Sequence, residues 1–194
     1  MKRLENVILE KGIVVGKDVL KVDAFLNHQI DPLLMMELAQ DLNEQFRNKT
    51  INKIVTIETS GIAPSAFLGY IMKVPVVYFK KSTSKILKDA IYQTNIHSFT
   101  KDIDYQISVS KQYLNKDDHV LFIDDFMANG EACLGAIDLI HQADAHLEGI
   151  GIVIEKAFQN GRSKVEKLGY SVYAQARIAS LENGNICFAD SSEL

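Results

Sequence analysis

The sequence predicts an α/β fold with a central parallel sheet flanked by helices. Short apolar runs such as Val120–Ile123 alternate along the chain with segments whose apolar residues recur every three or four positions. This alternation is typical of parallel strands joined by right-handed helical crossovers. Two apolar runs also end in small polar loops that lead into a helix. In a parallel sheet such loops gather at the carboxyl edge of the strands, where ligands bind.

The N-terminal part contains the clearest helix signal. Leu4–Lys11 is predicted as a short helix, and a longer one begins at Asp31, because aspartate caps exposed backbone N–H groups and Pro32 is tolerated at the first position. Between them, Val19–Ile30 is predicted as an extended stretch. The core stripe of the longer helix repeats every four residues and consists of Leu34, Leu38, Leu42 and Phe46, supported by Met35 and Ala39.

The rest of the chain supplies the remaining strands. They are predicted at Ile51–Ile57, Val74–Phe79, Tyr105–Val109, Val120–Ile123, Gly149–Ile154, Val172–Ala176 and Ile186–Ala189. A helix is expected to begin near Pro64, and another runs from Gly161 to Leu168, where Gly169 ends it. The polar stretch from Ser82 to Lys101 has little periodicity, which leaves two alternatives, a lid loop or a β-ribbon.

Composition narrows the class of protein. The 194 residues are 47% hydrophobic and 24% charged, which predicts one domain spanning residues 1–194. The net charge of −4 gives no overall attraction to nucleic acid or to an anionic membrane, so an anionic ligand must be held locally. Cys133 and Cys187 have neither metal-ligand spacing nor the pattern of a disulfide framework and are expected to be reduced core residues. With no signal peptide or membrane span indicated, a cytoplasmic protein is expected.

The candidate site is centred on Val120–Ala132. Asp124 and Asp125 follow an apolar run and are expected at the crevice, although two acids alone are also typical of a solvated strand end. The loop that opens the next helix is predicted to cradle an anion with its backbone N–H groups; it consists of Ala128, Asn129, Gly130, Glu131 and Ala132. Gly130 would allow close approach of that anion. Acids and cradle together suit a ribose 5-phosphate.

A second small polar loop precedes the helix near Pro64. It consists of Glu58, Thr59, Ser60 and Gly61, and it is either a second anion site or only a turn. The next strand ends at Lys80–Lys81, and Lys85 and Lys88 follow. A lysine run of this kind is either a solvated face or, at a strand's carboxyl end, a contact for an anionic ligand such as a diphosphate.

The stretch Val120–Ala132 resembles the phosphoribosyl-diphosphate signature of the type I phosphoribosyltransferases. Three flanking blocks, Leu20–Asp31, Ile57–Pro64 and Gly151–Arg162, resemble the bacterial members of that family that use xanthine, and the likeness covers essentially the whole chain. The resemblance implies the type I phosphoribosyltransferase fold. It also implies a small hood over the base pocket, formed by about residues 1–35 and 155–194, and a flexible lid loop.

The resemblance further implies a reaction. Xanthine would displace diphosphate from 5-phosphoribosyl 1-diphosphate, giving xanthosine 5'-monophosphate, with Mg²⁺ held mainly through diphosphate and ribose oxygens rather than by a protein metal site. Asp124 and Asp125 would hold the ribose hydroxyls and favour a developing ribosyl cation. The loop Ala128–Ala132 would hold the 5-phosphate, and Glu58–Gly61 with Lys81 would receive the diphosphate.

The same resemblance assigns the base pocket and the oligomer. Leu20, Asn27 and Lys156 match residues that contact xanthine; an amide can donate and accept at a purine edge, and a lysine donates to an oxo group. From the local sequence alone, Asn27 is equally a residue of an ordinary turn. A homodimer is implied, with Phe25–Leu26 and the Met35–Met36 part of the long helix as candidate interface or, equally, core.

One departure and three alternatives remain. Hypoxanthine–guanine enzymes carry an aspartate where Ala128 stands, whereas adenine enzymes share the alanine, so the group that accepts the base proton is unassigned. The chain could instead serve hypoxanthine, guanine or adenine. It could be a phosphoribosyl-diphosphate-sensing regulator that binds nucleic acid, which residues 1–50 disfavour with seven Lys and Arg against eight Asp and Glu. Lastly, it could be a structural relative with a dead site, although both acids and both loops are present.

Overall fold

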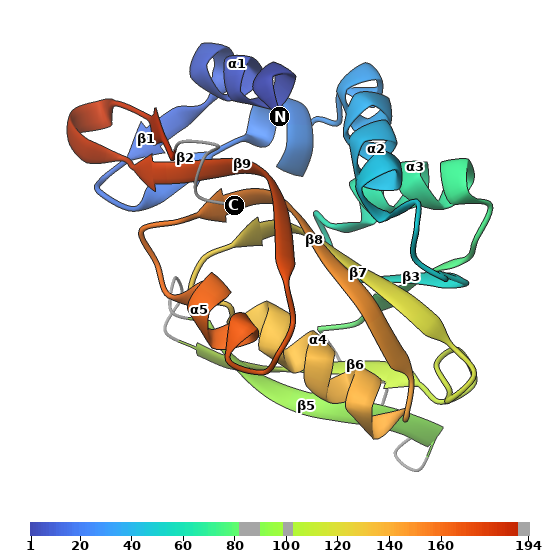
Figure 1. The fold of residues 1–194 in the computed structure, drawn as a ribbon. Coiled ribbons are helices and arrows are strands. Elements are labelled where there is room, and N and C mark those ends of the chain that lie inside the picture. The colour runs from blue at the N-terminus through green and yellow to red at the C-terminus, as the bar shows by residue number, and fades with distance from the viewer. Residues whose placement is uncertain (82–89, 99–102, 190–194) are drawn as a thin grey trace.

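A six-stranded sheet in the order β10-β9-β8-β7-β3-β4 forms the centre of the molecule in a computed structural model that describes residues 1–81, 90–98 and 103–189 (Figure 1). Neighbouring strands run parallel except β10, which is antiparallel to β9. The strands are β3 (Lys53–Ile57), β4 (Val76–Phe79), β7 (His119–Met127), β8 (His146–Lys156), β9 (Val172–Ser180) and β10 (Cys187–Phe188). The predicted α/β fold with a central parallel sheet is confirmed.

Helices cover both faces of this sheet. α2 (Pro32–Phe46) and α3 (Ile62–Met72) lie on one face, and α4 (Glu131–Gln142) and α5 (Gly161–Glu166) lie on the other (Figure 1). Because side chains alternate along a strand, β7 serves both layers. Leu121 and Ile123 pack with residues of α2 and α3, whereas Val120 and Phe122 pack with residues of α4.

The start of α2 is as the sequence predicts. The Asp31 side chain accepts hydrogen bonds from the backbone N–H groups of Leu33 and Leu34, at 3.1 and 3.2 Å, and Pro32 occupies the first helical position. The predicted core stripe is buried along its whole length: Leu34, Met35, Leu38, Ala39, Leu42 and Phe46.

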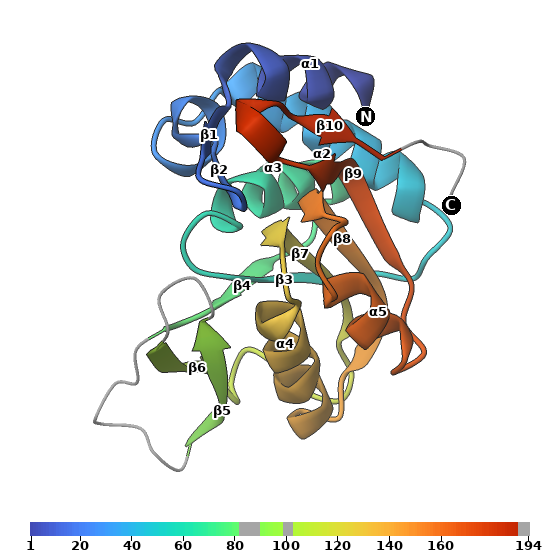
Figure 2. The same ribbon diagram turned by 90° about the vertical axis from the view of Figure 1, so that its left-hand side faces the viewer.

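The N-terminal segment forms a cap on the sheet, which we call the hood. It comprises α1 (Lys2–Lys11), β1 (Ile13–Val15), β2 (Val19–Lys21) and the π-helix η1 (Asp23–Asn27), joined by η3 (Glu182–Gly184) and β10 from the C-terminal end (Figure 2). Its apolar side chains pack against Val153, Ile154, Ala176 and Ile178, in the carboxyl halves of β8 and β9.

The expected extended stretch Val19–Ile30 is wrong beyond Lys21. Phe25 and Leu26 are adjacent and both buried. A strand would turn them to opposite faces, whereas a helical turn directs both into the hood core. Phe25, Leu26 and Met35 are therefore core residues in this structure and not exposed interface material.

Residues 91–110 include a two-stranded antiparallel ribbon, β5 (Ile91–Ser98) with β6 (Ile103–Ser110). The polar stretch from Ser82 to Lys101 was expected to be either a lid loop or a β-ribbon, and its part Ile91–Ser98 is a strand of a β-ribbon. The ribbon packs on α4 through Ile96 and Ile107, close to Gly135, where an added Cβ atom would lie 2.5 Å from Ile96 Cδ1. Lys85 and Lys88 lie outside the described residues.

Several strands are longer than predicted. β7 continues through Asp124 and Asp125, because its ladder with β8 still pairs Phe126 with Ile154, and β8 continues through Lys156. The strands were predicted to end where the apolar run meets polar residues, but the hydrogen bonds between neighbouring strands continue past that point. The two acids therefore lie within β7 and not after it.

Cys133 and Cys187 are both free. Cys133 is buried in α4, as expected, but Cys187 is exposed, so its assignment to the core was wrong. It lies in the short strand β10, which is at the edge of the sheet formed by the described strands. In the described part of the chain, no helix has the length and apolar character needed to cross a membrane.

The packing of α2 on β8 gives a stability prediction. A Cβ atom at Gly149 would lie 2.5 Å from Phe46 Cε1, so this helix rests on bare backbone there. Gly149→Val should lower the free energy of unfolding by about 1–3 kcal/mol despite valine's preference for strands. Urea unfolding checks this. Phe46→Leu should lower the free energy of unfolding by less in the Gly149→Val variant than in the wild type. If the effects of the two substitutions were simply additive, the packing explanation would be contradicted.

Candidate active site

Asp124 is withdrawn from solvent at the carboxyl end of β7. Its side chain is 6% exposed, and its Oδ1 atom accepts a hydrogen bond from the backbone N–H of Asp125 at 3.0 Å. Burial, followed by the negative charge of Asp125, raises the pKa of Asp124 well above its usual range, and burial also raises the pKa of Asp125. The acids are therefore not a solvated strand end. The raised pKa values mean that the two carboxylates are stabilised either by binding a proton or by a cation beside them.

The loop after β3 packs directly onto this acid. A Cβ atom at Gly61 would lie 2.1 Å from Thr56 Oγ1 and 3.0 Å from Asp124 Oδ1, so only glycine fits. The Thr56 hydroxyl is buried and has no hydrogen-bond partner among the described residues. The sequence did not single out Thr56, because a β-branched residue in a strand is ordinary. Its place beside Gly61 depends on how the loop after β3 folds back on the end of that strand.

Glu58 ties this loop to the end of β4. Its backbone N–H donates to the Phe79 carbonyl at 3.1 Å, and its Oε1 atom accepts from the backbone N–H of Lys81 at 2.6 Å. The peptide bond that joins Glu58 to Thr59 is cis. Thr59 is exposed and Ser60 half-buried before α3 begins at Ile62, two residues earlier than expected.

Lys81 faces the two acids. Its positive charge lowers the pKa values of Asp124 and Asp125, which opposes the effect of their burial. The Lys81 Nζ atom also lies 5.4 Å from the centre of the Tyr105 ring, which belongs to the ribbon. The structure thus brings Glu58, Gly61 and Lys81, predicted from separate segments, to the same crevice as the acids.

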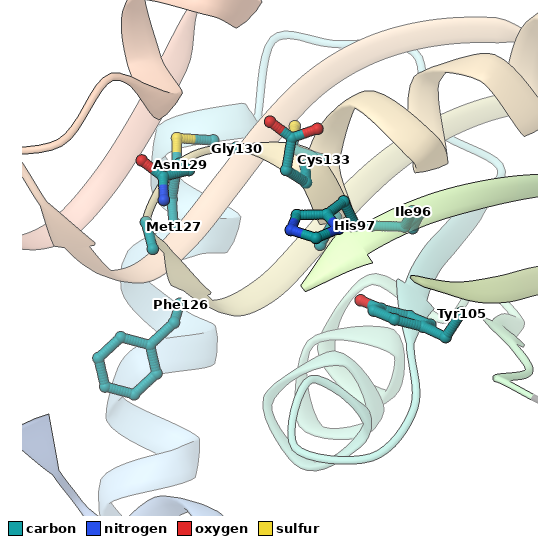
Figure 3. A pocket seen from close by; sticks show the side chains of 11 residues that line it. Ile96, His97, Tyr105, Phe126, Met127, Asn129, Gly130 and Cys133 are labelled. Carbon is teal, nitrogen blue, oxygen red and sulfur yellow. The ribbon is translucent and has the colours of Figure 1, made fainter. Parts of the chain in front are cut away.

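The loop from Ala128 to Ala132 borders a cavity of about 130 Å³. Gly130 has a φ of +85° and precedes α4, which begins at Glu131, so the loop ends at a helix N-terminus. Exposed backbone N–H groups and the helix dipole favour an anion there. The far wall comes from the ribbon, through Ile96, His97 and Tyr105 (Figure 3). The sequence did not indicate these three residues because the ribbon's approach is a tertiary contact.

Gly130 has a second role that the sequence did not reveal. A Cβ atom at Gly130 would lie 2.8 Å from the Cα atom of Gly161, the first residue of α5. The backbone N–H of Gly161 donates to the Ala128 carbonyl at 3.1 Å, and Lys164 of α5 pairs with Glu131. The loop is therefore held between the starts of two helices.

Lys156 is the last residue of β8. Its ammonium donates to the backbone carbonyl of Asp18, in the β1–β2 turn, at 2.6 Å and lies 5.9 Å from the centre of the Phe126 ring. Burial lowers the pKa of Lys156. Leu20, in the same hairpin, is buried at 6% exposure and helps form the hood core. Asn27 is exposed at the end of η1, and its amide makes no hydrogen bond among the described residues.

The donors in the crevice are limited for a metal ion. Among the described residues, no group of three or more His, Cys, Asp or Glu side chains is placed to hold one. The adjacent carboxylates of Asp124 and Asp125 are oxygen ligands of the kind that Mg²⁺ prefers, and Mg²⁺ commonly takes one or two carboxylates with substrate phosphates. The donor set fits a Mg²⁺ ion that arrives with an anionic substrate.

Comparison with known proteins now adds the family. Residues 21–174 match the model of the phosphoribosyl transferase domain. The chain is 53% identical over 190 residues to the xanthine phosphoribosyltransferase of Listeria innocua, which covers 98% of this chain and 99% of that protein. It is 52% identical over 188 residues to the xanthine phosphoribosyltransferase of Acinetobacter baylyi, covering 97% and 98%.

Solved structures show the same fold at low identity. An adenine phosphoribosyltransferase from Trypanosoma brucei, in complex with AMP, pyrophosphate and ribose-5-phosphate, superposes with a TM-score of 0.75 at 15% identity, over 90% of this chain and 79% of that one. The enzyme from Rhodothermus marinus gives 0.73 at 21% identity, over 91% and 99%.

The raised pKa of Asp124 predicts a pH-dependent penalty on stability. Between the ordinary aspartate value, about 3.9, and the higher folded value, the folded chain binds more protons than the unfolded chain, so stability falls as pH rises through this window. Asp124→Asn should therefore stabilise the fold at pH 7 by roughly 0.5–2 kcal/mol, while any turnover is lost. The gain should shrink towards pH 4.

Urea unfolding at pH 7 and pH 4 measures this difference. Asp117→Asn, at an exposed position, is the matched control and should leave stability nearly unchanged at both pH values. If Asp124→Asn were less stable than wild type at pH 7, the ionised Asp124 carboxylate would not be destabilising the folded protein.

Proposed function

The chain belongs to the phosphoribosyltransferase family, and from this premise we propose that it is an enzyme that transfers the phosphoribosyl group to xanthine. The substrates are xanthine and 5-phosphoribosyl 1-diphosphate, and the products are xanthosine 5'-monophosphate and diphosphate. The observation that carries the proposal is that one strand end, that of β7, supplies both the buried Asp124 carboxylate and the loop Ala128–Ala132 that lines a cavity, while Lys156 ends the neighbouring strand β8. The names of relatives 52–53% identical over nearly the whole chain support xanthine as the base.

The acids act on the sugar. The bond between ribose and diphosphate breaks with positive charge developing on the ring, and the carboxylates of Asp124, which is buried, and Asp125, which is half-buried, stabilise that charge. Their raised pKa values express the same preference, since a cation beside them relieves the unfavourable burial of negative charge. The rate enhancement arises from positioning and electrostatics and needs no covalent protein intermediate.

The two loops hold the phosphates. The 5-phosphate binds in the cavity at Ala128–Ala132, where backbone N–H groups replace water as donors. The diphosphate is received by Glu58–Gly61 and Lys81, of which Lys81 supplies the positive charge. Mg²⁺ would enter with this substrate and would supply positive charge for the leaving group, next to the charge that Lys81 provides. Glu58 contributes by ordering the Lys81 backbone at 2.6 Å.

Base choice rests on Lys156 and Asn27. An ammonium donates and cannot accept, so Lys156 favours a purine with an oxo group at position 6 and disfavours adenine, whose amino group there is also a donor. Asn27 can hold the 2-oxo edge that distinguishes xanthine from hypoxanthine. Leu20 supports the hairpin that carries the Asp18 carbonyl, which keeps Lys156 at the crevice. These segments make up the hood of a single catalytic domain spanning residues 1–194.

A homodimer and a cytoplasmic location complete the proposal. α3 contains no charged residue, and its Tyr70 is 78% exposed. Leu33, on α2, is 76% exposed. A second copy of the chain would remove these side chains from water. The two free thiols fit a reducing compartment. Nucleic acid and membrane have no part in the proposal.

The first test is of base choice, by steady-state kcat/KM for xanthine, guanine, hypoxanthine and adenine. Wild type should prefer xanthine. Lys156→Met should lower kcat/KM for xanthine by roughly a hundredfold, because the 6-oxo group loses a charged donor, while phosphoribosyl diphosphate still binds. Asn27→Ala should narrow the gap between xanthine and hypoxanthine.

Lys167→Met removes an exposed lysine outside the crevice and serves as the control; its kinetics should match wild type. A wild-type preference for adenine would refute the substrate assignment. Full xanthine activity in Lys156→Met would refute the role given to that lysine.

The second test is of the dimer, by sedimentation equilibrium. Tyr70→Glu should shift the protein from dimer towards monomer, because burying an unpaired carboxylate in an apolar interface is unfavourable. Leu168→Glu makes a comparable change at an apolar side chain that is 55% exposed after α5, and it should leave the dimer intact. Equal dimerisation of all three proteins would place the interface elsewhere.

A further inference from the structure

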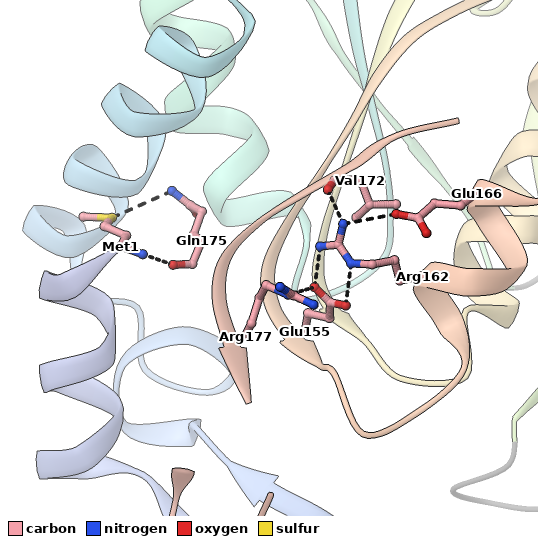
Figure 4. Close-up of polar contacts among 7 residues, drawn as sticks. All are labelled: Met1, Glu155, Arg162, Glu166, Val172, Gln175 and Arg177. Atoms are coloured by element: carbon pink, nitrogen blue, oxygen red, sulfur yellow. Dashed lines mark hydrogen bonds and ion pairs between the residues drawn. The ribbon is translucent and has the colours of Figure 1, made fainter. Parts of the chain in front are cut away.

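A buried ion cluster joins the ends of β8 and β9 to α5. Glu155 is only 2% exposed, and both its carboxylate oxygens are bound by Arg162, from Nε at 2.8 Å and from Nη2 at 2.6 Å. Arg177, the cross-strand partner of Glu155, donates from Nε at 3.1 Å (Figure 4). The fork of one guanidinium thus matches one carboxylate.

The arginine makes further contacts that fix its orientation. Arg162 Nη1 donates to the Val172 carbonyl at 2.8 Å and lies 3.5 Å from a carboxylate oxygen of Glu166 (Figure 4). Hydrogen bonding to Glu155 raises the pKa of Arg162, so the guanidinium stays charged. A lysine could not bridge both carboxylate oxygens and a backbone carbonyl at once, because its donors radiate from one atom.

Stability alone is a weak reason for such a cluster. Removing charges from water carries a penalty, and well-packed apolar residues often replace a buried ion cluster without loss of stability. Among the described residues, the buried Arg177 Nη1 moreover has no hydrogen-bond partner. Compared with apolar contacts, the ion cluster makes the packing specific. Paired charges with fixed hydrogen bonds allow only one relative placement of the elements that they join.

The cluster lies between two parts of the crevice. On one side, Glu155 directly precedes Lys156, whose ammonium faces the hood hairpin. On the other side, Arg162 directly follows Gly161, whose N–H donates to the Ala128 carbonyl of the anion-binding loop at 3.1 Å. Only residues 157–160 separate Lys156 from α5, and this short turn is closed by a 2.9 Å hydrogen bond from the Gln159 N–H to the Lys156 carbonyl.

We propose that Arg162, through Glu155, is a positioning residue that sets the anion-binding loop and the Lys156 ammonium at a fixed separation. This inference rests on the proposed function, in which those two parts hold the 5-phosphate and the base. The 5-phosphate and the base belong to the same nucleotide product. The distance between the two protein parts that hold them must therefore match the distance between these groups in that molecule. α5 carries the constraint from the cluster to the loop through the close contact of Gly161 with Gly130.

A triple variant separates positioning from stability. Replacing Glu155, Arg162 and Arg177 together by Met removes the buried charges of the cluster and leaves no buried ion unpaired, since Glu166 is exposed. The folded variant should keep a Tm near wild type. Its KM values for phosphoribosyl diphosphate and for xanthine should each rise by about tenfold or more, since a displacement of about 1 Å in positioned groups has effects of this size.

Arg162→Lys is the conservative partner of the triple variant. It retains the charge but loses the two-point contact, so both KM values should rise by a smaller factor at an unchanged fold. Glu166→Gln is the matched control, because it removes a charge beside the same guanidinium without touching Glu155; its KM values should equal those of wild type. Lys164→Met removes the ion pair with Glu131 and should raise the KM for phosphoribosyl diphosphate but not for xanthine.

Calorimetric titration with phosphoribosyl diphosphate and Mg²⁺ in the absence of a base gives an independent readout. The triple variant should bind this substrate more weakly than wild type and Glu166→Gln. A folded triple variant with wild-type affinity and wild-type KM values would overturn the proposal. If the triple variant does not fold, wild-type constants in Arg162→Lys overturn it equally. A wild type that binds phosphoribosyl diphosphate but does not convert xanthine would refute the substrate assignment and leave this titration a valid test of the positioning.

Discussion

The burial of the Asp124 carboxylate is the constraint around which the crevice is built. A negative charge held at the end of a central strand, at 6% exposure, is unfavourable unless positive charge or donors lie nearby. The structure supplies a backbone N–H from Asp125 and the more distant ammonium of Lys81, and the pKa of Asp124 remains raised. In the proposed reaction, the positive charge that develops on the ribose ring would complete this compensation.

The arrangement of loops follows from this constraint. Gly61 must lack a side chain because Thr56 and Asp124 already occupy the space beside it, and Glu58 joins the loop after β3 to the backbone of Lys81 at the end of β4. The helix that follows this loop, α3, is the same uncharged helix that exposes Tyr70. Substrate binding and subunit association would therefore act on the two ends of one rigid element.

The sequence was informative where chemistry is local. The cap at Asp31, the stripe of α2 and the loop from Ala128 to Ala132 depend on spacing within one segment, and these were predicted. The contacts of Gly161 with Ala128 and Gly130 depend on how segments distant in the sequence align in the fold, and no periodicity reports that. The π-helix at Asp23–Asn27 was missed because the burial of Phe25 and Leu26 is decided by α1 and β9, far away in sequence.

The unequal burial of the two cysteines has a practical consequence. Burial raises the pKa of the Cys133 thiol, which keeps it protonated and shielded, whereas Cys187 is exposed in β10 at the rim of the hood. Thiol-reactive dyes should therefore attach at Cys187 alone in the folded protein, without any engineered substitution. A fluorophore there would report on the surroundings of β10 and its partner strand β9, and hence on movements of the hood as ligands arrive.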